Sequence, residues 1–254
     1  MIRRIHYAII DSTNSEARRL SENGLDEPLL VTATEQFAGR GRHGRAWHSP
    51  RGGAWMSLAW PVRKPPIAYA AIALPAAVGV HRGLRDVVSY AADFRIKWPN
   101  DLLVSDQKVG GVLCEQLISG SRADALVIGV GINVDFDLAE LPSDLRHPAT
   151  TLRAAFGKNY DVEKVIEAVS ERLAEVIADF EAHGLTSSLV KEVQDNLAYL
   201  GKVRSITIGG ETIAGRVAGI DDAGRLLLDT SKGRIACETG EFAAAHEAAD
   251  RNRM

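Results

Sequence analysis

The chain is poor in cysteine: it has only Cys114 and Cys237 in 254 residues, far apart in the sequence. Two isolated cysteines form no disulfide framework and supply no ligand cluster for zinc, so a reducing cytosol is the expected environment. A long apolar run is also missing at the N-terminus, where six mostly apolar residues separate Arg4 from Asp11. Because this segment is too short for a secretory signal or a membrane span, we expect a cytoplasmic protein.

An excess of positive charge is missing as well. The formal net charge is −3 and the sequence pI is about 6.2, which argues against a protein whose main role is to coat nucleic acid. Hydrophobic residues make up 46% and charged residues 25%, as in ordinary soluble globular proteins. The length suffices for one sizeable core and a smaller second domain.

Apolar periodicity and turn residues predict a mixture of strands and helices. Strands are predicted over 5–10, 29–34, 55–60 and 94–98, and a hairpin over 108–118 and 125–134 with a polar turn at 119–122. Helices are predicted over about 13–23, over 66–88 and over 161–184. The first helix would begin at a capping box from Thr13 to Glu16, and Pro75 would kink or split the second.

The texture changes after Leu200 to short β-branched segments separated by glycine turns. This pattern predicts a small all-β domain that ends near Glu241 and Phe242. We therefore expect a larger domain over 1–198, a β domain over 199–245 and a disordered tail over 246–254.

Glycine and arginine alternate in a segment that we call the anion loop (residues 35–51). It holds four arginines and one acidic residue, a local balance of +3 in a negative chain. Glycine lets the backbone bend until successive N–H groups point at one anion, while guanidinium groups close from the sides. Because ordering each backbone residue costs about 1–2 kcal/mol, we expect the loop to close only on a ligand that supplies several charge-assisted contacts.

A second polar cluster begins where Lys97 ends a predicted strand and a Trp-Pro turn follows. We expect this turn to bring Asn100 and Asp101 to the strand edge, with Lys97 and Lys108 facing the anion loop. The alternative is that Lys97 and Asp101 are solvated strand ends around a turn. The pair Gly110-Gly111 indicates that a neighbour approaches the backbone closely.

Other chemistries have little support. The run from Gly129 to Asn133 lacks the following helix that the dinucleotide fingerprint requires. His43 and His48 have no third metal ligand at a useful spacing, so we expect both to be exposed and expect no metal site. The sequence has no Gly-x-Ser-x-Gly elbow and no cysteine in the anion loop, which leaves covalent catalysis without support. The pattern indicates that cationic side chains and backbone N–H groups bind an anion.

The polar motifs of the chain, taken in order, resemble those of biotin protein ligases. They are Asp11-Ser12-Thr13-Asn14, Gln36, Gly39-Arg40-Gly41-Arg42-His43-Gly44-Arg45-x-Trp47, Ser49-Pro50, Lys97-Trp98-Pro99-Asn100-Asp101, Lys108-Val109-Gly110-Gly111 and Gly129-x-Gly131-Ile132-Asn133. The resemblance covers nearly the whole chain. It implies an α+β fold, in which a mixed sheet with flanking helices is similar to the catalytic domain of class II aminoacyl-tRNA synthetases and precedes a small SH3-like barrel.

The resemblance also implies an activity. Enzymes of this kind join biotin to the α-phosphate of ATP, release pyrophosphate, and pass the biotinyl group to one lysine of a carrier protein. The implied substrates are ATP with Mg²⁺ and biotin, and the usual partner is the biotin carboxyl carrier subunit of acetyl-CoA carboxylase. Some relatives carry an N-terminal helix-turn-helix, but here the motifs begin at Asp11, so we expect no DNA partner. We expect no membrane partner. The sequence is compatible with either a monomer or a homodimer.

The resemblance assigns roles to individual residues. Those implied to bind biotin are Ser12, Thr13, Asn14, Gln36, Gly39, Arg40, Gly41, Arg42, Lys108, Gly110 and Gly111. Those implied to bind ATP are Arg40, Arg42, Arg45, Trp47, Asn100, Lys108 and Asn133. The implied catalytic residues are Arg42, Lys97, Asp101 and Lys108. Asp101 would partner the incoming lysine, whose reference pKa is about 10.4 and which must lose a proton before it attacks.

Three rival interpretations remain. A lipoate or octanoate ligase of related fold would bind an acyl chain without a ureido ring, and the polar Ser12, Thr13, Asn14 and Gln36 argue for the ring. A non-catalytic biotin-binding protein would not need Lys97, Asp101 and Lys108. An RNA-binding protein could use the anion loop with Trp47, Trp55 and Trp60 as stacking platforms, but the acidic balance weighs against it.

Overall fold

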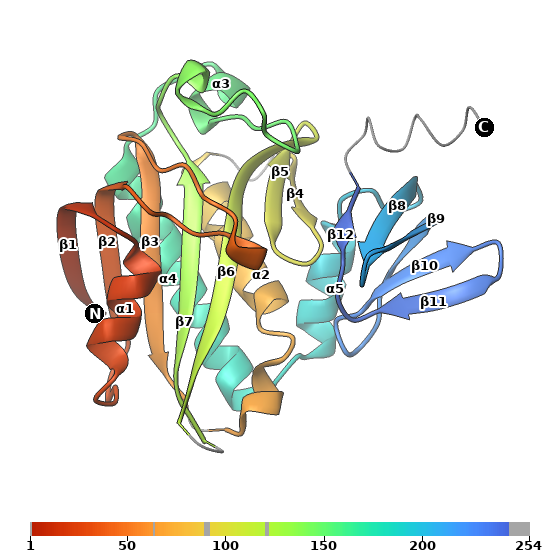
Figure 1. The fold of residues 1–254 in the computed structure, drawn as a ribbon, viewed down its shortest axis with the longest axis horizontal. Helices are drawn as coiled ribbons and strands as arrows, with labels where there is room; N and C mark the ends of the chain where they lie inside the picture. The colour runs from red at the N-terminus through yellow and green to blue at the C-terminus, as the bar shows by residue number, and fades with distance from the viewer. Residues whose placement is uncertain (1, 63, 89–91, 120–121, 244–254) are drawn as a thin grey trace.

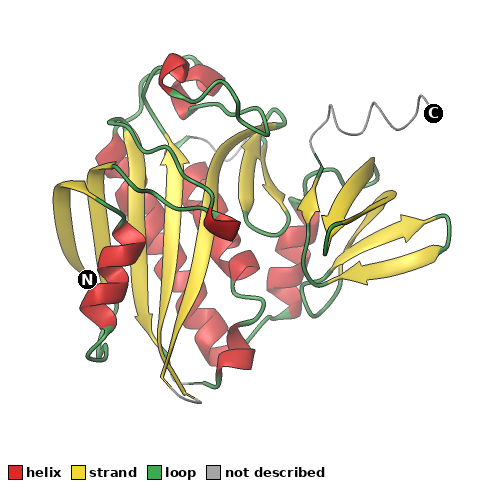
Figure 2. Cartoon of the chain, viewed as in Figure 1, coloured by secondary structure: helices red, strands yellow, loops and turns green. Residues whose placement is uncertain are grey.

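The chain builds two β-sheets that differ in size and in how helices cover them (Figures 1 and 2). The structure is a computed structural model that describes residues 2–62, 64–88, 92–119 and 122–243. The expected α+β class is confirmed, because a seven-stranded mixed sheet with flanking helices precedes a five-stranded sheet. The predicted tail over 246–254 lies outside the described residues.

The large sheet has the strand order β1-β2-β3-β7-β6-β5-β4. Its first two strands run parallel to each other, and all its other neighbours are antiparallel. The strands are β1 (Arg3–Ile10), β2 (Leu29–Gln36), β3 (Gly53–Pro61), β4 (Phe94–Lys97), β5 (Asp101–Val104), β6 (Gln107–Ser119) and β7 (Arg122–Asn133). The predicted hairpin is β6 and β7, and residues 120–121 of its turn lie outside the described residues. Strand β5 was not predicted.

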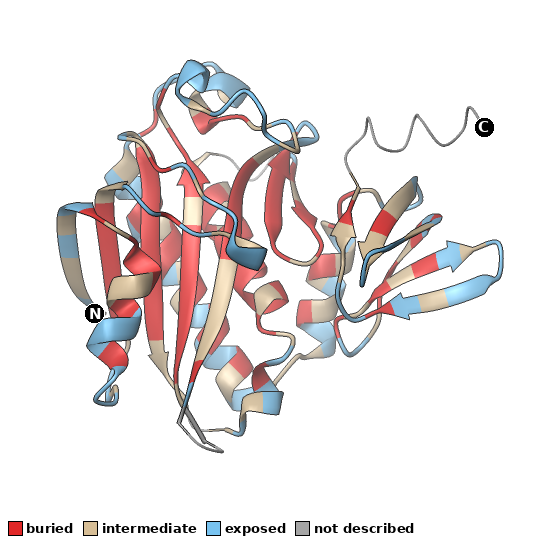
Figure 3. Ribbon diagram, viewed as in Figure 1, coloured by how far each residue is buried: buried red, intermediate tan, exposed pale blue. Residues whose placement is uncertain are grey.

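Helices cover both faces of the large sheet. Along β2, Leu29 and Val31 pack with Ala17 of α1 (Thr13–Ser21), whereas Leu30 belongs to the main core. This alternation follows from the two-residue period of a strand. The main core lies against α2 (Ala73–Val87) and α4 (Val162–His183), which pack together behind the sheet (Figure 3). Helix α1 covers only the lower part of the opposite face, and the segment that follows β2 crosses the upper part (Figure 1).

The predicted helix over 161–184 is confirmed as α4. The side chain of Asp161 accepts a hydrogen bond from the backbone N–H of Glu163 at 2.9 Å, and Gly184 caps the C-terminal end. The segment over 66–88 is split into a short 3-10 helix, η2 (Pro66–Tyr69), and α2, with Pro75 in the first turn of α2, where a proline is tolerated. By length and composition Pro66–Val87 could span a membrane, but 67% of it is buried inside the fold.

The first helix begins at Thr13 as predicted, but its N-cap is one residue earlier than the expected capping box. Ser12 is the N-cap and accepts from the backbone N–H of Ser15 at 3.5 Å. Thr13 is the first helical residue, and its hydroxyl donates instead to the Gln36 amide oxygen at 3.0 Å. Four further elements were not predicted: α5 (Ser187–Asp195) and the short η1 (Arg42–Gly44), η3 (Leu138–Glu140) and α3 (Leu152–Phe156).

The small sheet has the order β11-β10-β9-β8-β12, with antiparallel neighbours throughout. Its strands are β8 (Val203–Ile208), β9 (Glu211–Ile220), β10 (Leu226–Thr230), β11 (Gly233–Cys237) and β12 (Glu241–Phe242). This is the expected all-β segment, and it is consistent with an SH3-like fold. Its apolar side chains join the main core, and the Trp98 indole donates to the carbonyl of Gly224 at 3.1 Å. The boundary at 198/199 stays a prediction.

One buried histidine, His81, should make the stability of the fold depend on pH. His81 on α2 is 1% exposed, and burial, reinforced by Arg85, lowers its pKa to about 4. The unfolded chain takes up this proton near pH 6.5, whereas the folded chain takes it up only near pH 4. The free energy of unfolding should therefore decrease as the pH is lowered from about 6.5 to about 4, by up to about 1.4 kcal/mol per pH unit.

Urea denaturation between pH 7 and pH 4.5 measures this slope. His81→Gln should make it shallower, whereas His183→Gln, at an exposed site on α4, should leave it unchanged. An equal slope in the wild type and His81→Gln would contradict the assignment.

Candidate active site

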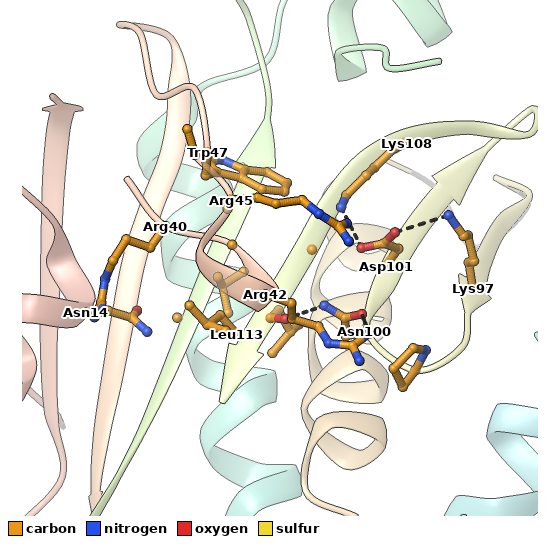
Figure 4. Close-up of a pocket in the computed structure, with 18 of the residues that line it drawn as sticks. Asn14, Arg40, Arg42, Arg45, Trp47, Lys97, Asn100, Asp101, Lys108 and Leu113 are labelled. Atoms are coloured by element: carbon orange, nitrogen blue, oxygen red, sulfur yellow. Dashed lines mark hydrogen bonds and ion pairs between the residues drawn. The ribbon is translucent and has the colours of Figure 1, made fainter. Parts of the chain in front are cut away.

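The candidate site is a pocket on the upper part of the sheet face that α1 leaves open. The anion loop crosses this face, with η1 in front of β6 (Figure 1). The pocket is lined by residues of α1, the anion loop, the β4–β5 turn and strands β6 and β7, together with His147 and Glu241. Figure 4 shows that it has two ends: Asn14 and Arg40 lie at one side, and Lys97, Asn100, Asp101 and Lys108 lie at the other.

Glycines in β6 and β7 make the floor of the pocket. A Cβ at Gly129 would come within 2.0 Å of the Asn14 side chain, and a Cβ at Gly131 within 2.6 Å of the Trp47 indole. The Gly-x-Gly motif therefore lets two side chains lie flat on the sheet. Gly111 has a similar role, because its Cβ would be 3.3 Å from Trp47, Asp101 and Lys108. Close approach, as expected for Gly110-Gly111, is confirmed.

The first end of the pocket, the polar end, consists of Ser12, Thr13, Asn14 and Gln36. The Gln36 amide oxygen accepts from the backbone N–H of Thr13 at 2.7 Å, and its nitrogen donates to Ser49 at 2.9 Å. Ser57 on β3 donates to Asn14 Oδ1 at 2.6 Å. Thr13, Asn14 and Ser57 are all buried, so these amides and hydroxyls are held in fixed orientations inside the fold.

The second end, the charged end, is an ion triad. Asp101 lies between two lysines: its Oδ1 is 2.6 Å from Lys108 Nζ, and its Oδ2 is 3.4 Å from Lys97 Nζ. Lys97 is 5% exposed and Asp101 is 9% exposed, so the solvated-turn alternative is wrong. Burial acts to raise the pKa of Asp101, but the charges of Lys108 and Lys97 outweigh it and hold that pKa below its ordinary value. Burial also lowers the pKa of Lys97, against the attraction of Asp101.

The anion loop contacts both ends of the pocket. Arg42 donates to the Asn100 side-chain oxygen at 3.1 Å, and Asn100 in turn donates to the carbonyl of Val112 at 2.7 Å. The ammonium of Lys108 lies 4.8 Å from the centre of the Trp47 ring, a cation–π contact. Arg40 extends the other way, toward the polar end.

Two residues of this site were missed by the sequence analysis. Glu241 of β12 forms ion pairs with Arg45 of the anion loop and, at 2.8 Å, with Arg146. These arginines outweigh the effect of burial and lower the pKa of Glu241. His147 lines the pocket, and burial together with Lys97 lowers its pKa to about 4, so its ring is neutral near pH 7. Both residues lie outside any recognisable motif.

Three residues with an implied ligand contact lie elsewhere among the described residues. Gly39, Gly110 and Asn133 do not line the pocket, and Asn133 is buried with its amide donating to the carbonyl of Thr150 at 3.0 Å. Their ligand contacts stay predictions. The RNA-stacking alternative is wrong for Trp55, which is fully buried and donates to the carbonyl of Pro50 at 2.8 Å.

Comparison with known families decides the identity of the fold. Residues 7–133 match the model of the Biotin/lipoate A/B protein ligase family, and residues 202–243 match the Biotin protein ligase C terminal domain. This chain belongs to the biotin protein ligase family, and it is a ligase. Among its relatives, the Biotin--[acetyl-CoA-carboxylase] ligase of Paracoccus denitrificans is 32% identical over 88% of this chain and 93% of its own length.

Two other members of the biotin protein ligase family also match most of this chain. The Bifunctional ligase/repressor BirA of Bacillus subtilis is 36% identical over 90% of this chain and 70% of its own length. The biotin protein ligase from Aquifex aeolicus, solved in complex with biotin and ATP, superposes with a TM-score of 0.81 at 29% identity, covering 96% of this chain and 98% of that one.

Proposed function

We propose that this biotin protein ligase forms biotinyl-5'-AMP from biotin and ATP, and transfers the biotinyl group to a lysine of a biotin carboxyl carrier protein. One observation carries the proposal: a polar end built from fixed amides and hydroxyls, and a charged end built from buried ions, face each other across one pocket under the anion loop. The relatives solved with biotin and ATP support the same pair of substrates.

The polar end suits the ureido ring of biotin, which offers one carbonyl and two N–H groups. Ser12, Thr13, Asn14 and Gln36 supply both donors and acceptors there. Because hydrogen bonds hold the amides of Asn14 and Gln36 in place, a ligand does not have to order them on binding.

The charged end suits the adenylation step. The biotin carboxylate attacks the α-phosphate of ATP and pyrophosphate leaves, so two anions must approach each other. We assign Lys108 and Arg42 to stabilise the charge that develops there. Mg²⁺ would enter with ATP, bound mainly to its phosphates, and the described part of the chain has no cluster of three or more His, Cys, Asp or Glu side chains to hold an ion.

The transfer step uses the same end of the pocket. The ammonium of the carrier lysine first gives up a proton to solvent, the free amine then attacks the biotinyl carbonyl, and AMP leaves as the bond between that carbonyl carbon and its phosphate oxygen breaks. Asp101 is held ionised by two lysines, so it can accept a hydrogen bond from the incoming ammonium and orient it beside the adenylate. Asp101 touches both Lys97 and Lys108, which joins the two half-reactions in one ion network.

The protein partner is proposed from the relatives. The Paracoccus denitrificans relative is named for acetyl-CoA carboxylase, and we propose the carrier subunit of that enzyme as the substrate here, in the cytoplasm. A homodimer and the absence of DNA binding stay predictions.

A two-stage mass-spectrometry experiment tests the proposal. The protein is incubated with biotin and MgATP, and the bound fraction is analysed for biotinyl-5'-AMP. A carrier domain is then added without further ATP, and the lysine that gains biotin is mapped. Adenylate that disappears as one lysine is modified is the expected result. Modification without a detectable adenylate, or an adenylate that never reaches the carrier, would contradict the two-step assignment.

Arg42→Gly should release the adenylate early. Arg42 ties the anion loop to Asn100, and losing a charge-assisted hydrogen bond of about 1.5–3 kcal/mol should speed the escape of the intermediate about ten-fold or more. Released adenylate should biotinylate lysines of a bystander protein, detected by blotting with streptavidin. Arg51→Gly, an exposed position in the same loop that does not line the pocket, is the matched control. Equal bystander labelling by both variants would refute the role of Arg42.

A further inference from the structure

Glu115 on β6 lies between the polar end of the pocket and the anion loop. A single carboxylate oxygen, Oε2, accepts from Asn14 Nδ2 at 2.8 Å and from Arg40 Nη2 at 3.1 Å. The Glu115 side chain is 28% exposed, so this contact is partly shielded from water. One side chain therefore contacts a residue of the proposed biotin site and the first arginine of the loop that covers it.

The contact with Glu115 fixes the orientation of Asn14. An ionised carboxylate only accepts hydrogen bonds, so the Asn14 amide must turn its nitrogen toward Glu115. Its oxygen then faces Ser57, whose hydroxyl donates to it at 2.6 Å. Asn14 lies against Gly129, where a side chain would clash with it. Glu115 thus selects which face of this buried amide is presented to a ligand.

The contact with Glu115 also holds the start of the anion loop. Arg40 pairs through its backbone with Ala46, which closes the segment that contains η1. Figure 4 shows the Arg40 side chain directed toward Asn14 and away from the charged end. The first arginine of the loop is therefore anchored at the polar end, whereas Arg42 is anchored at Asn100.

We propose that Glu115 is a positioning residue that couples occupation of the polar end to closure of the anion loop. A ligand that hydrogen-bonds Asn14 stabilises the arrangement in which Asn14 and Arg40 share the Glu115 carboxylate, and the closed loop in turn keeps Asn14 oriented for the ligand. The inference rests on the proposed function, because it takes biotin as the ligand of the polar end.

Glu115→Gln tests the coupling at nearly constant size. The amide keeps one acceptor oxygen in place of Oε2 but carries no charge, so the hydrogen bond from Arg40 loses its charge assistance even where the contact remains. Biotin binding, measured by calorimetry without ATP, should weaken about ten-fold, as for the loss of one charge-assisted hydrogen bond. The melting temperature of ligand-free Glu115→Gln should equal that of ligand-free wild type, because the Glu115 side chain is partly exposed.

The control is the ion pair of Glu35 and Arg51, which joins the two ends of the anion loop and lies outside the pocket. Glu35→Gln should bind biotin like the wild type. Arg40→Gln should weaken binding about as much as Glu115→Gln, and the double variant should be no weaker than either single variant. Additive losses would mean that the two residues act separately, and would overturn the proposal.

Limited trypsin digestion reads loop closure directly. Saturating biotin should slow cleavage at the arginines of the anion loop in the wild type and in Glu35→Gln, but not in Glu115→Gln. Equal protection in all three proteins would overturn the coupling. If the wild type itself fails to bind biotin, the proposed function fails, an outcome distinct from normal binding and protection in Glu115→Gln.

Discussion

Replacing Lys108 with methionine should lower the rate of adenylate formation by about 10²–10³-fold, the usual cost of removing one preorganised donor from a developing charge. Lys108 is the more exposed lysine of the triad, with 25% of its side chain accessible, and Trp47 and Asp101 hold its ammonium in place. Methionine keeps the length of the side chain and most of its packing but removes the charge. The deficit should appear mainly in the rate of the chemical step.

The measurement is single-turnover formation of adenylate from saturating biotin and MgATP. Lys158→Met is the matched control, because Lys158 also lies over an aromatic ring, 5.0 Å from the centre of Tyr160, but does not line the pocket. We expect a wild-type rate for that variant. A Lys108→Met enzyme that forms adenylate normally would remove Lys108 from the catalytic assignment.

Replacing Asp101 with asparagine should damage both stability and transfer. Lys97 is buried, and the Asp101 carboxylate is its closest opposite charge. Breaking a buried ion pair by removing one partner costs about 3–5 kcal/mol, which urea denaturation would register. Transfer from preformed adenylate to the carrier should also slow, because the carboxylate that orients the incoming ammonium is gone.

A second variant separates these two effects. In Lys97→Met/Asp101→Asn no buried charge lacks a counter-ion at this position, so much of the lost stability should return while transfer stays slow. Asp195→Asn breaks an exposed pair with Lys191 on α5 and should cost only about 0.3–0.5 kcal/mol. An Asp101→Asn protein as stable as the wild type would show that the triad is not a buried network. Normal transfer in the stabilised double variant would remove Asp101 from that step.

Features of the fold that depend on residues close together in the sequence were predictable. Helix α4 follows from apolar residues at a 3.6-residue period between Asp161 and Gly184, which supply its caps. The β6–β7 hairpin follows from two long apolar runs around a polar turn. Strand β5 escaped prediction because it has only four residues and begins directly after a turn.

The site residues also divide into those that were predictable from their spacing in the sequence and those that were not. The ion triad could be anticipated because Lys97 and Asp101 are four residues apart and Lys108 follows on the paired strand. The contact between Arg45 and Glu241 spans the two sheets and leaves no local signal. The N-cap of α1 was misplaced by one residue because Ser12 and Thr13 are both residue types that cap helices, so the local sequence does not distinguish them.

The most direct test of the central claim is acid-dependent exchange of labelled pyrophosphate into ATP in the presence of Mg²⁺. Biotin, lipoate and octanoate are supplied in parallel, with a reaction that lacks any acid as the background reference. The account predicts exchange with biotin and background exchange with the two acyl acids, because the polar end matches a ureido ring. Exchange driven by lipoate or octanoate instead, or no exchange with any of the three acids, would contradict it.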